Sequence, residues 1–324
     1  MEKITVHEYK AENREEWESF VETSNNGTMF HKMAFLDYHP HGKFDFYHLM
    51  FRRGEELVAV LPGGLKENGA IFWSPVGASY GSIVTKDIPF ALALEIVDTF
   101  MEFCKFKGIK EVFLIPPPLI YSINYQQHVE YAMLYRKFDF ELHYISHSVP
   151  LNKGDYFKNI DAKARRIIRK NRREHIIQVR ESNDYEAFYP ILEKNKAKFN
   201  VKPTHSLEDL KKLEKLMPNN LKLFMAYYNE TPVAGSLLFL TNKKVALCFY
   251  IMLLYEYNKY HPNFILMDET LNWAQSNGYE WFDIGVSQDT SSDDPMTPSL
   301  NLIYFKERFN SRGILRSTYH FKFD

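Results

Sequence analysis

The sequence predicts an α/β (α+β) protein built from two domains of similar organisation. The chain has 324 residues, which is enough for two domains of ordinary size. Segments that alternate apolar and polar residues, as strands do, occur among segments with helical spacing of apolar residues. The order of these segments in the first half returns in the second half, so we expect two domains, at residues 1–150 and 151–324.

The first half is expected to hold six strands and three well-marked helices. The pattern predicts strands at 4–9, 44–51, 56–61, 70–73, 112–115 and 138–149, and helices at 13–22, 33–38 and 90–107. Asn13 can cap the first helix, with Glu16 at the capping-box position. Gly108 ends the long helix, and three prolines at 116–118 end the strand that follows it.

The second half is expected to follow the same plan. The pattern predicts strands at 176–180, 221–228, 232–240, 244–253, 281–284 and 314–323, and helices at 155–174, 184–198, 207–216 and 263–276. Asn229 and Glu230 form the turn of a hairpin, and Gly278 ends the last helix.

The repeat is one of pattern rather than of identical residues. A hairpin-like segment in the first half reads YHLMFRRGEELVAVLPGG, and its counterpart reads LFMAYYNETPVAGSLLF. A helix followed by a short buried strand reads FALALEIVDTFMEFCKFKGIKEVFLIPPP, and its counterpart reads NFILMDETLNWAQSNGYEWFDIGVS. A duplicated fold explains this order, and the base rates shared by all α/β proteins are the alternative explanation.

Composition excludes several classes of protein. The net charge of −1 provides no overall field for DNA or an anionic membrane, so an anionic partner must find a local patch. Cys104 and Cys248 stand in apolar runs and are expected to be buried thiols. The histidines lack the spacing of a metal site. No apolar run reaches ~18 residues and no signal peptide is evident, so we expect a cytoplasmic protein without a membrane span.

The segment from Asn277 to Phe309 holds the first candidate catalytic residues. Lys306 lies among aromatic residues, next to Phe305, and a sheltered cation can stabilise an oxyanion or hold a phosphate. The alternative is a lysine that extends its charge to water from a helix start. Asp283, in the short strand before it, could orient an amine or act as a base, or it could simply satisfy main-chain groups at the strand end.

A strongly basic helix is the second candidate feature. Residues 163–173 hold seven cations within eleven residues, among them Lys163, Arg165, Arg169 and Arg172. Such a face suits a ligand that carries phosphates, and we expect these cations to hold the phosphates of the acceptor. A solvated helix face is the alternative. Aromatic residues do not alternate with the cations, so we do not expect sequence-specific reading of RNA.

Two further places could bind substrates. The helix at 263–276 begins with Asn263, Phe264 and Ile265 after a proline, and its free N–H groups could bind a donor pyrophosphate. An ordinary helix start is the alternative. Tyr80 and Gly81 lie on a glycine-containing loop that could line an acceptor groove, and a packed ring in a turn is the alternative.

The order of hairpin, strand, helix and strand resembles the core of the GNAT acyltransferases, and its duplication resembles the FemAB-type aminoacyltransferases. The resemblance rests on KARRIIRKNRREHIIQVRES, on the helix and strand that end in WFDIG, on LIYFKERFNSRG and on ASYGSIV. It implies two tandem GNAT-like domains with mixed, mainly antiparallel sheets. It also implies that Lys306, in the FK of this motif, lies beside the transferred acyl group.

The resemblance implies an N-acyltransferase (EC 2.3) that moves an acyl or aminoacyl group from an activated donor to an amine. The donor would be acyl-CoA or aminoacyl-tRNA, with no tightly bound cofactor, and the acceptor a phosphate-bearing amine such as a peptidoglycan precursor of the cell wall. The Q/R-x-x-G-x-G/A loop of ordinary acetyltransferases is replaced by YNKYHPNFIL, so the choice of donor stays open. The alternative is a non-catalytic scaffold that binds RNA or another anionic partner through the 163–173 helix.

Overall fold

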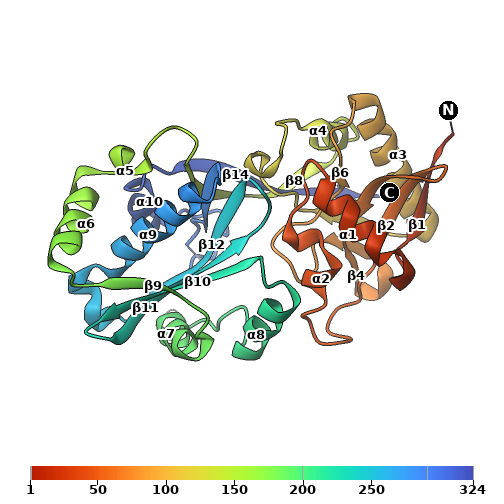
Figure 1. Cartoon of the computed structure of the whole chain (residues 1–324). Helices are drawn as coiled ribbons and strands as arrows, with labels where there is room; N and C mark the ends of the chain where they lie inside the picture. Colours follow the sequence, from red (N-terminus) through yellow and green to blue (C-terminus); the bar gives the residue numbers. More distant parts are fainter. Residues whose placement is uncertain (1, 199, 290, 324) are drawn as a thin grey trace. The chain divides into compact units, whose positions relative to one another are not determined.

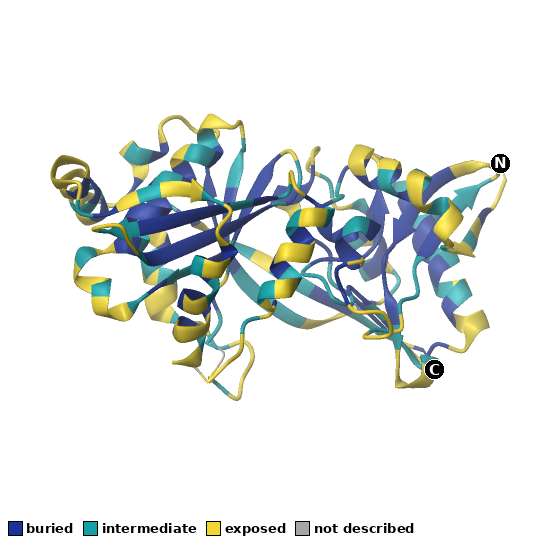
Figure 2. Cartoon of the chain, turned by 60° about the horizontal axis from the view of Figure 1, so that its bottom comes forward, coloured by how far each residue is buried: buried dark blue, intermediate teal, exposed yellow. Residues whose placement is uncertain are grey.

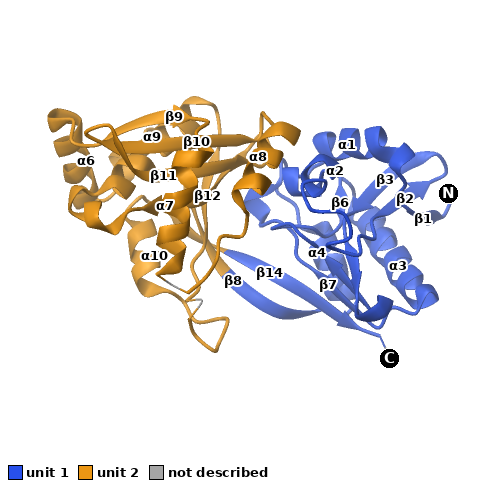
Figure 3. Ribbon diagram, turned by 90° about the horizontal axis from the view of Figure 1, so that it is seen from below, with its two compact units in different colours: residues 1–144, 315–324 blue, residues 145–314 orange. Residues whose placement is uncertain are grey.

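A computed structural model describes residues 2–198, 200–289 and 291–323 of the chain (Figure 1). Its contacts divide the chain into two compact units, coloured separately in Figure 3. Unit 1 comprises residues 1–144 and 315–324, and unit 2 comprises residues 145–314. The expected domains at 1–150 and 151–324 remain a prediction, because such contacts show which residues pack together and not which segments fold alone.

Unit 1 contains strands of two sheets. An antiparallel sheet has the order β1 (Ile4–Glu8), β2 (Leu49–Arg53), β3 (Glu56–Leu61) and β6 (Val84–Thr85). In the other sheet, β4 (Gly64–Lys66) pairs with β5 (Ile71–Ser74), and β5 runs parallel to β7 (Glu111–Leu114), which pairs with β14 (Arg312–Lys322). The hairpin and the parallel pair of this unit therefore lie in different sheets.

The helices of unit 1 are α1 (Arg14–Thr23), α2 (Met33–Leu36), α3 (Phe90–Lys107) and α4 (His128–Tyr135). The long helix α3 connects toward β7 and ends at Gly108, whose φ of +74° suits the glycine predicted to stop it. A continuous apolar core joins α3 to β2, β3 and β7, with Phe100 and Phe72 fully buried in contact at its centre.

Unit 2 contains a run of six neighbouring strands of one sheet. Its order is β8 (Asp139–Pro150), β13 (Trp281–Val286), β12 (Val245–Leu253), β11 (Thr231–Leu240), β10 (Leu221–Tyr228) and β9 (Gln178–Ser182). Every neighbouring pair is antiparallel except β12 and β13. The sheet is thus mixed and mainly antiparallel, with one parallel pair joined by a helical crossover.

The helices of unit 2 are α5 (Tyr156–Asn159), α6 (Ala162–Glu174), α7 (Tyr185–Ala197), α8 (Leu207–Leu216), α9 (Pro262–Ser276) and α10 (Leu300–Glu307). Helices α6 and α9 lie on one face of the sheet and α7 and α8 on the other (Figure 1). The sheet strands are buried while the outer helix faces are exposed (Figure 2).

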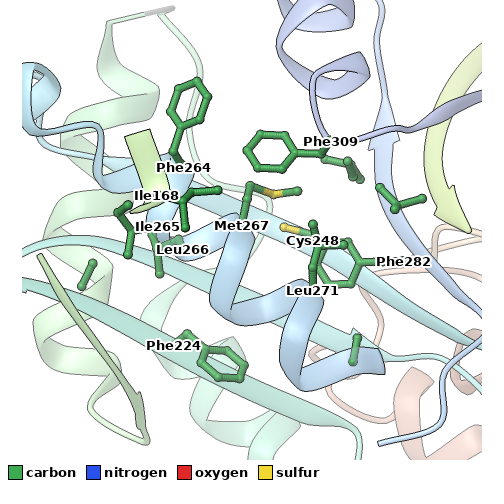
Figure 4. Close-up of a cluster of buried hydrophobic side chains, with 14 of the residues drawn as sticks. Ile168, Phe224, Cys248, Phe264, Ile265, Leu266, Met267, Leu271, Phe282 and Phe309 are labelled. Carbon is green, nitrogen blue, oxygen red and sulfur yellow. The ribbon is translucent and has the colours of Figure 1, made fainter. Parts of the chain in front are cut away.

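Helix α9 forms the centre of the core of unit 2. Leu266, Met267 and Leu271 are fully buried, and they pack with Cys248 and Phe282 from the parallel strands (Figure 4). Nine of the fifteen residues of α9 are buried, which is typical of a helix packed into a core. Cys104 and Cys248 are both buried and free, as expected.

The structure differs from the predicted elements in several places, and the strand predicted at 44–51 begins only at Leu49. The predicted helix at 155–174 is two helices, because Asp161 accepts the N–H groups of Lys163 and Ala164 and so caps a new helix. The segment around Lys306 forms a helix of two turns, with Lys306 near its end rather than its start. The short strands β4 and β6 were not predicted, since two or three residues carry too little pattern.

Candidate active site

Strand β13 carries a β-bulge where it faces β8. The register shifts between Asp283 and Val286, so that Ile284 and Gly285 lie opposite the single residue His147. Gly285 has a φ of +75°, which a glycine adopts without strain, and its N–H donates to Oδ1 of Asp283 at 2.8 Å. Bulges of this kind redirect main-chain groups and occur beside active sites.

Lys306 reaches the bulge from α10. Its Nζ donates to the carbonyl oxygens of Gly285 at 2.8 Å and Val286 at 2.7 Å, and to Oγ of Ser287 at 2.9 Å. The side chain is 2% exposed, and this burial lowers the pKa of Lys306 to about 8, although the charge of Asp283 acts in the opposite direction. All three ammonium hydrogens therefore have partners within the chain, and Lys306 stabilises the bulge.

Ser287 connects Lys306 to His147. The Oγ atom of Ser287 lies 2.8 Å from Nδ1 of His147, and both residues are buried. Main-chain bonds hold the serine on both sides: its N–H donates to the carbonyl of Ile145, and its carbonyl accepts the N–H of Ser299. Burial, and then the charge of Lys306, lower the pKa of His147. Sequence inspection missed His147 and Ser287, because the pairing of β8 with β13 has no local signal.

Of the three predicted catalytic residues, Lys306 and Asp283 lie near each other at the bulge, whereas Phe305 does not. Asp283 is completely buried near Lys306, where its carboxylate binds the main chain, as one of the two interpretations expected. Phe305 points elsewhere, into an edge-to-face cluster with Phe264 and Phe309 at 5.4 Å from each ring. A catalytic role for these residues stays a prediction, and the geometry favours a packing role for Phe305.

A basic groove of about 1080 Å³ lies between α6 and the segment before α9. Arg166, Arg169, Lys170 and Arg173 of α6 line one side, and Lys259, Tyr260 and His261 line the other. None of the described lining residues is acidic, although Glu174 pairs with Arg173 at 2.8 Å just outside. The groove is therefore strongly cationic.

The positive field reaches the start of α9. His261 occupies the N-cap position of α9, and burial followed by the charges of Arg308 and Lys170 lowers its pKa. A helix N-terminus adds partial positive charge to that of the side chains. The groove therefore has the electrostatic character of a site for phosphates.

Helical spacing explains which cations line the groove. Residues 162, 166, 169, 170 and 173 recur at three- and four-residue intervals and so share one face of α6. Of the cations predicted to bind phosphate, only Arg169 is on that face. Lys163 is exposed and does not line the groove, and Arg165 donates to the carbonyl of Lys158. A helical-face analysis of the sequence could have found Arg166, Lys170 and Arg173, but not Lys259.

Arg172 is engaged inside unit 2. Its guanidinium donates to Oδ2 of Asp268 at 2.7 and 3.2 Å, and Tyr156 donates to Oδ1 of the same carboxylate at 2.8 Å. Asp268 is 1% exposed, and burial raises its pKa while Arg172 opposes that shift. Asp268 is buried in this ion pair while about half of the Arg172 side chain is exposed, and the pair ties α5, α6 and α9 together, so the geometry gives Arg172 a structural role.

The predicted donor-binding residues lie beside the groove but do not line it. Phe264 and Ile265 are buried in the core, and the N–H of Phe264 already donates to the carbonyl of His261. Asn263 is half-buried, and its Oδ1 atom has no hydrogen-bond partner among the described residues. Tyr260 and His261, directly upstream of these residues, line the groove instead.

Tyr80 and Gly81 belong to unit 1 and have structural contacts. Tyr80 is 2% exposed, and the guanidinium of Arg316 lies 4.7 Å from the centre of its ring. A Cβ at Gly81 would stand 2.4 Å from Oγ of Ser74, and its carbonyl is bonded to buried His31. This is the packed arrangement that was the alternative to an acceptor site, and the acceptor role stays a prediction.

The groove and the Lys306 cluster share one topological position in unit 2. The parallel strands β12 and β13 are paired only over Val245–Leu247 and Trp281–Asp283, at their beginnings. The segment that lines the groove follows the end of β12, and Ser287 follows the end of β13. Carboxyl ends of parallel strands, beside a helix N-terminus, are where α/β proteins bind ligands.

Comparison with known proteins supports the predicted resemblance. A family model described as an acetyltransferase (GNAT) domain matches residues 158–293. No curated protein sequence matches the chain significantly. No helix among the described residues combines the length and the apolarity that a membrane crossing needs.

Three solved structures share the fold over almost the whole chain. FemX aligns with a TM-score of 0.72 at 11% identity, over 98% of this chain and 97% of its own. The C-terminal domain of a putative lysylphosphatidylglycerol synthetase from Agrobacterium fabrum aligns with a TM-score of 0.61 at 12% identity, over 96% and 92%. A tandem GNAT protein from the clavulanic acid biosynthesis pathway aligns with a TM-score of 0.56 at 8% identity, over 99% and 98%.

These matches confirm the resemblance to FemAB-like proteins and to the GNAT superfamily, as well as the predicted fold class. Residues 158–293 match the GNAT acetyltransferase family model, and almost the whole chain shares the fold of FemX and of a tandem GNAT protein.

Proposed function

We propose that the protein is an N-acyltransferase that moves an acyl or aminoacyl group from an activated donor to an amine. One observation carries this proposal: a basic groove and a buried lysine cluster both lie at the carboxyl ends of the parallel strands of a GNAT domain. The groove would hold the phosphates of the donor, acyl-CoA or aminoacyl-tRNA. Donor and acceptor are substrates, and no tightly bound cofactor is part of the proposal.

In this proposal the groove fixes the donor, and the protonated form of Lys306 supplies a positive charge near the reacting carbonyl. Lys306 is held by three bonds and shielded from water, so its charge acts strongly at short range without moving. Catalysis would then come from orientation and electrostatics, without a covalent intermediate on the protein. The acceptor would be an amine that carries phosphate, such as a cell-wall precursor, and the reaction would take place in the cytoplasm.

The donor groove predicts a specific binding defect. Replacing Arg169 and Arg173 together with glutamine removes two lining cations, and we expect the affinity for acetyl-CoA or CoA to fall about 10- to 100-fold. Lys163→Gln is the matched control, since Lys163 lies on the same helix, is exposed and does not line the groove. Isothermal titration calorimetry measures both variants against the wild type.

If the double variant and the control bind acetyl-CoA or CoA with equal affinity, the groove is not the donor site. Transfer itself is tested by mass spectrometry of amine acceptors incubated with acyl-CoA or with aminoacyl-tRNA. If short RNA binds in the groove and neither donor supports transfer to any amine, the non-catalytic scaffold that binds RNA through α6 replaces the enzyme in this proposal.

A further inference from the structure

The basic groove of unit 2 has two sides of different chemistry. Helix α6 supplies a cationic side that runs from Arg166 to Arg173, with Arg169 and Lys170 between them. These residues are exposed, so a ligand in the groove can reach their charged groups. A rise of about 1.5 Å per residue spreads the row over roughly 10 Å of helix, which is more than a single phosphate group needs. The row can therefore hold two phosphates that are separated from each other.

The other side of the groove carries an aromatic ring. Tyr260 is half-buried and lines the groove together with Lys259 and His261. The ring of Tyr228, at the end of β10, stacks on Tyr260 with 4.4 Å between the ring centres and 19° between the planes. The hydroxyl of Tyr228 donates to that of Tyr260, which raises the pKa of Tyr228 and lowers the pKa of Tyr260. Stacking and hydrogen bond together fix the ring of Tyr260 at the groove.

A row of cations opposite an aromatic ring is a combination that binds nucleotides. The cations attract the phosphates, and the ring stacks on the flat face of a base. The sequence alone does not reveal this arrangement, because Tyr260 lies far from α6 along the chain. The groove therefore fits a ligand that joins phosphates to an aromatic base.

We propose that the groove recognises the phosphorylated adenosine of the donor, with the adenine base against Tyr260 and the phosphates along α6. This inference rests on the proposed function, which assigns the donor to the groove. Coenzyme A contains an adenosine with phosphates at its 3′ and 5′ positions, and aminoacyl-tRNA ends in an adenosine that follows phosphodiesters. The two classes of donor thus share the group that the groove binds, and Tyr260 recognises its base.

The first test uses adenosine 3′,5′-bisphosphate, which lacks both the acyl group and the pantetheine arm of acyl-CoA. Isothermal titration calorimetry should show that Tyr260→Leu binds it about 10-fold more weakly than the wild type, because stacking on the base is lost. Tyr260→Trp keeps an aromatic surface and should stay within about 3-fold of the wild type. Equal affinities of Tyr260→Leu and the wild type would overturn the proposal.

Pyrophosphate separates recognition of the base from a change in the groove itself. At low ionic strength its affinity should differ less than about 2-fold between Tyr260→Leu and the wild type, because the cations bind it without the ring. Tyr257→Leu is the matched control: Tyr257 packs against the same core and its ring lies 5.7 Å from that of Tyr228, but it does not line the groove. If Tyr260→Leu loses both ligands equally, the ring only supports the groove, and the proposal is wrong.

Two larger probes distinguish the sources of the adenosine. Acetyl-CoA represents one class of donor, and the RNA trinucleotide CCA represents the end of a tRNA. Whichever of them the wild type binds should bind about 10-fold more weakly to Tyr260→Leu. If the double variant of Arg169 and Arg173 weakens this binding and Tyr260→Leu does not, the donor groove stands and only the present inference fails. If the wild type binds neither probe, the proposed function fails, and adenosine 3′,5′-bisphosphate still decides whether the base is recognised.

The salt dependence of binding provides an independent check. Stacking involves no net charge, so the loss in Tyr260→Leu should be the same factor at about 50 mM and at about 300 mM salt. The loss in the double variant of Arg169 and Arg173 should shrink as the salt concentration rises. A loss in Tyr260→Leu that shrinks in the same way would show that the ring acts through a neighbouring cation, and recognition of the base would be excluded.

Discussion

Replacing Lys306 with methionine is expected to lower the free energy of unfolding by about 3 kcal/mol. The substitution leaves the carbonyl oxygens of Gly285 and Val286 buried without their donor, and it removes the partner of Ser287. Relief of the buried charge offsets part of this loss. A catalytic lysine at the surface of a cleft could be removed with little effect on stability. Lys306 is buried, so its removal is expected to destabilise the fold.

Chemical denaturation near neutral pH measures this effect, and a thermal scan should show a melting temperature roughly 6–12 °C lower. Lys163→Met is the control, because Lys163 is an exposed helical lysine of the same unit, and its replacement should change stability by less than about 0.5 kcal/mol. If Lys306→Met is as stable as the control, the three bonds do not contribute to stability as their geometry implies.

The same substitution should change how stability depends on pH. The lowered pKa of Lys306 means that the folded chain releases this proton near pH 8, whereas the unfolded chain holds it up to about 10.5. The unfolded state binds more protons in this interval, so the wild type gains stability from this group as the pH rises. The difference between the wild type and Lys306→Met should therefore be larger at about pH 10 than at about pH 7.5. A constant difference would show that the pKa of Lys306 is not lowered.

The repeated pattern of the sequence predicted the fold because helices and strands of this length carry strong periodicity. Helix 90–107 and helix 263–276 each precede a strand that runs parallel to an earlier one. The short strands and the break at Asp161 could not be predicted so well. A single capping carboxylate decides that break, and two-residue strands depend on their neighbours in space.

The candidate site was predicted less completely than the fold. Lys306 stood out because a cation among aromatic residues is unusual, but its partners depend on the bulge at Gly285, which appears only when β13 pairs with β8. The basic helix was recognised by its composition, which does not say which face a cation occupies. As a result Arg172 was grouped with Arg169, although one pairs with Asp268 and the other lines the groove.

Replacing Arg172 with methionine should separate structural from ligand-binding cations on α6. The variant leaves the buried carboxylate of Asp268 with the hydroxyl of Tyr156 as a side-chain partner, and we expect a loss of about 2 kcal/mol in unfolding free energy near pH 7, less than for a pair that is buried on both sides. Affinity for CoA should change less than about 2-fold, because Arg172 does not line the groove. Arg169→Gln should show the reverse, with reduced affinity and near-normal stability.

The loss in Arg172→Met should shrink at acidic pH, because the carboxyl of Asp268 can escape its buried charge by binding a proton. Burial raises the pKa of Asp268, and removing the opposing charge of Arg172 raises it further, so the folded state holds this proton more tightly than the unfolded state. Stability is then gained as the pH falls through the folded pKa and lost as it rises. The double variant Arg172→Met with Asp268→Asn should recover part of the loss, since no charge is left unpaired. Additive losses would mean that the two side chains do not interact, and Arg172 would again be a candidate to bind phosphate.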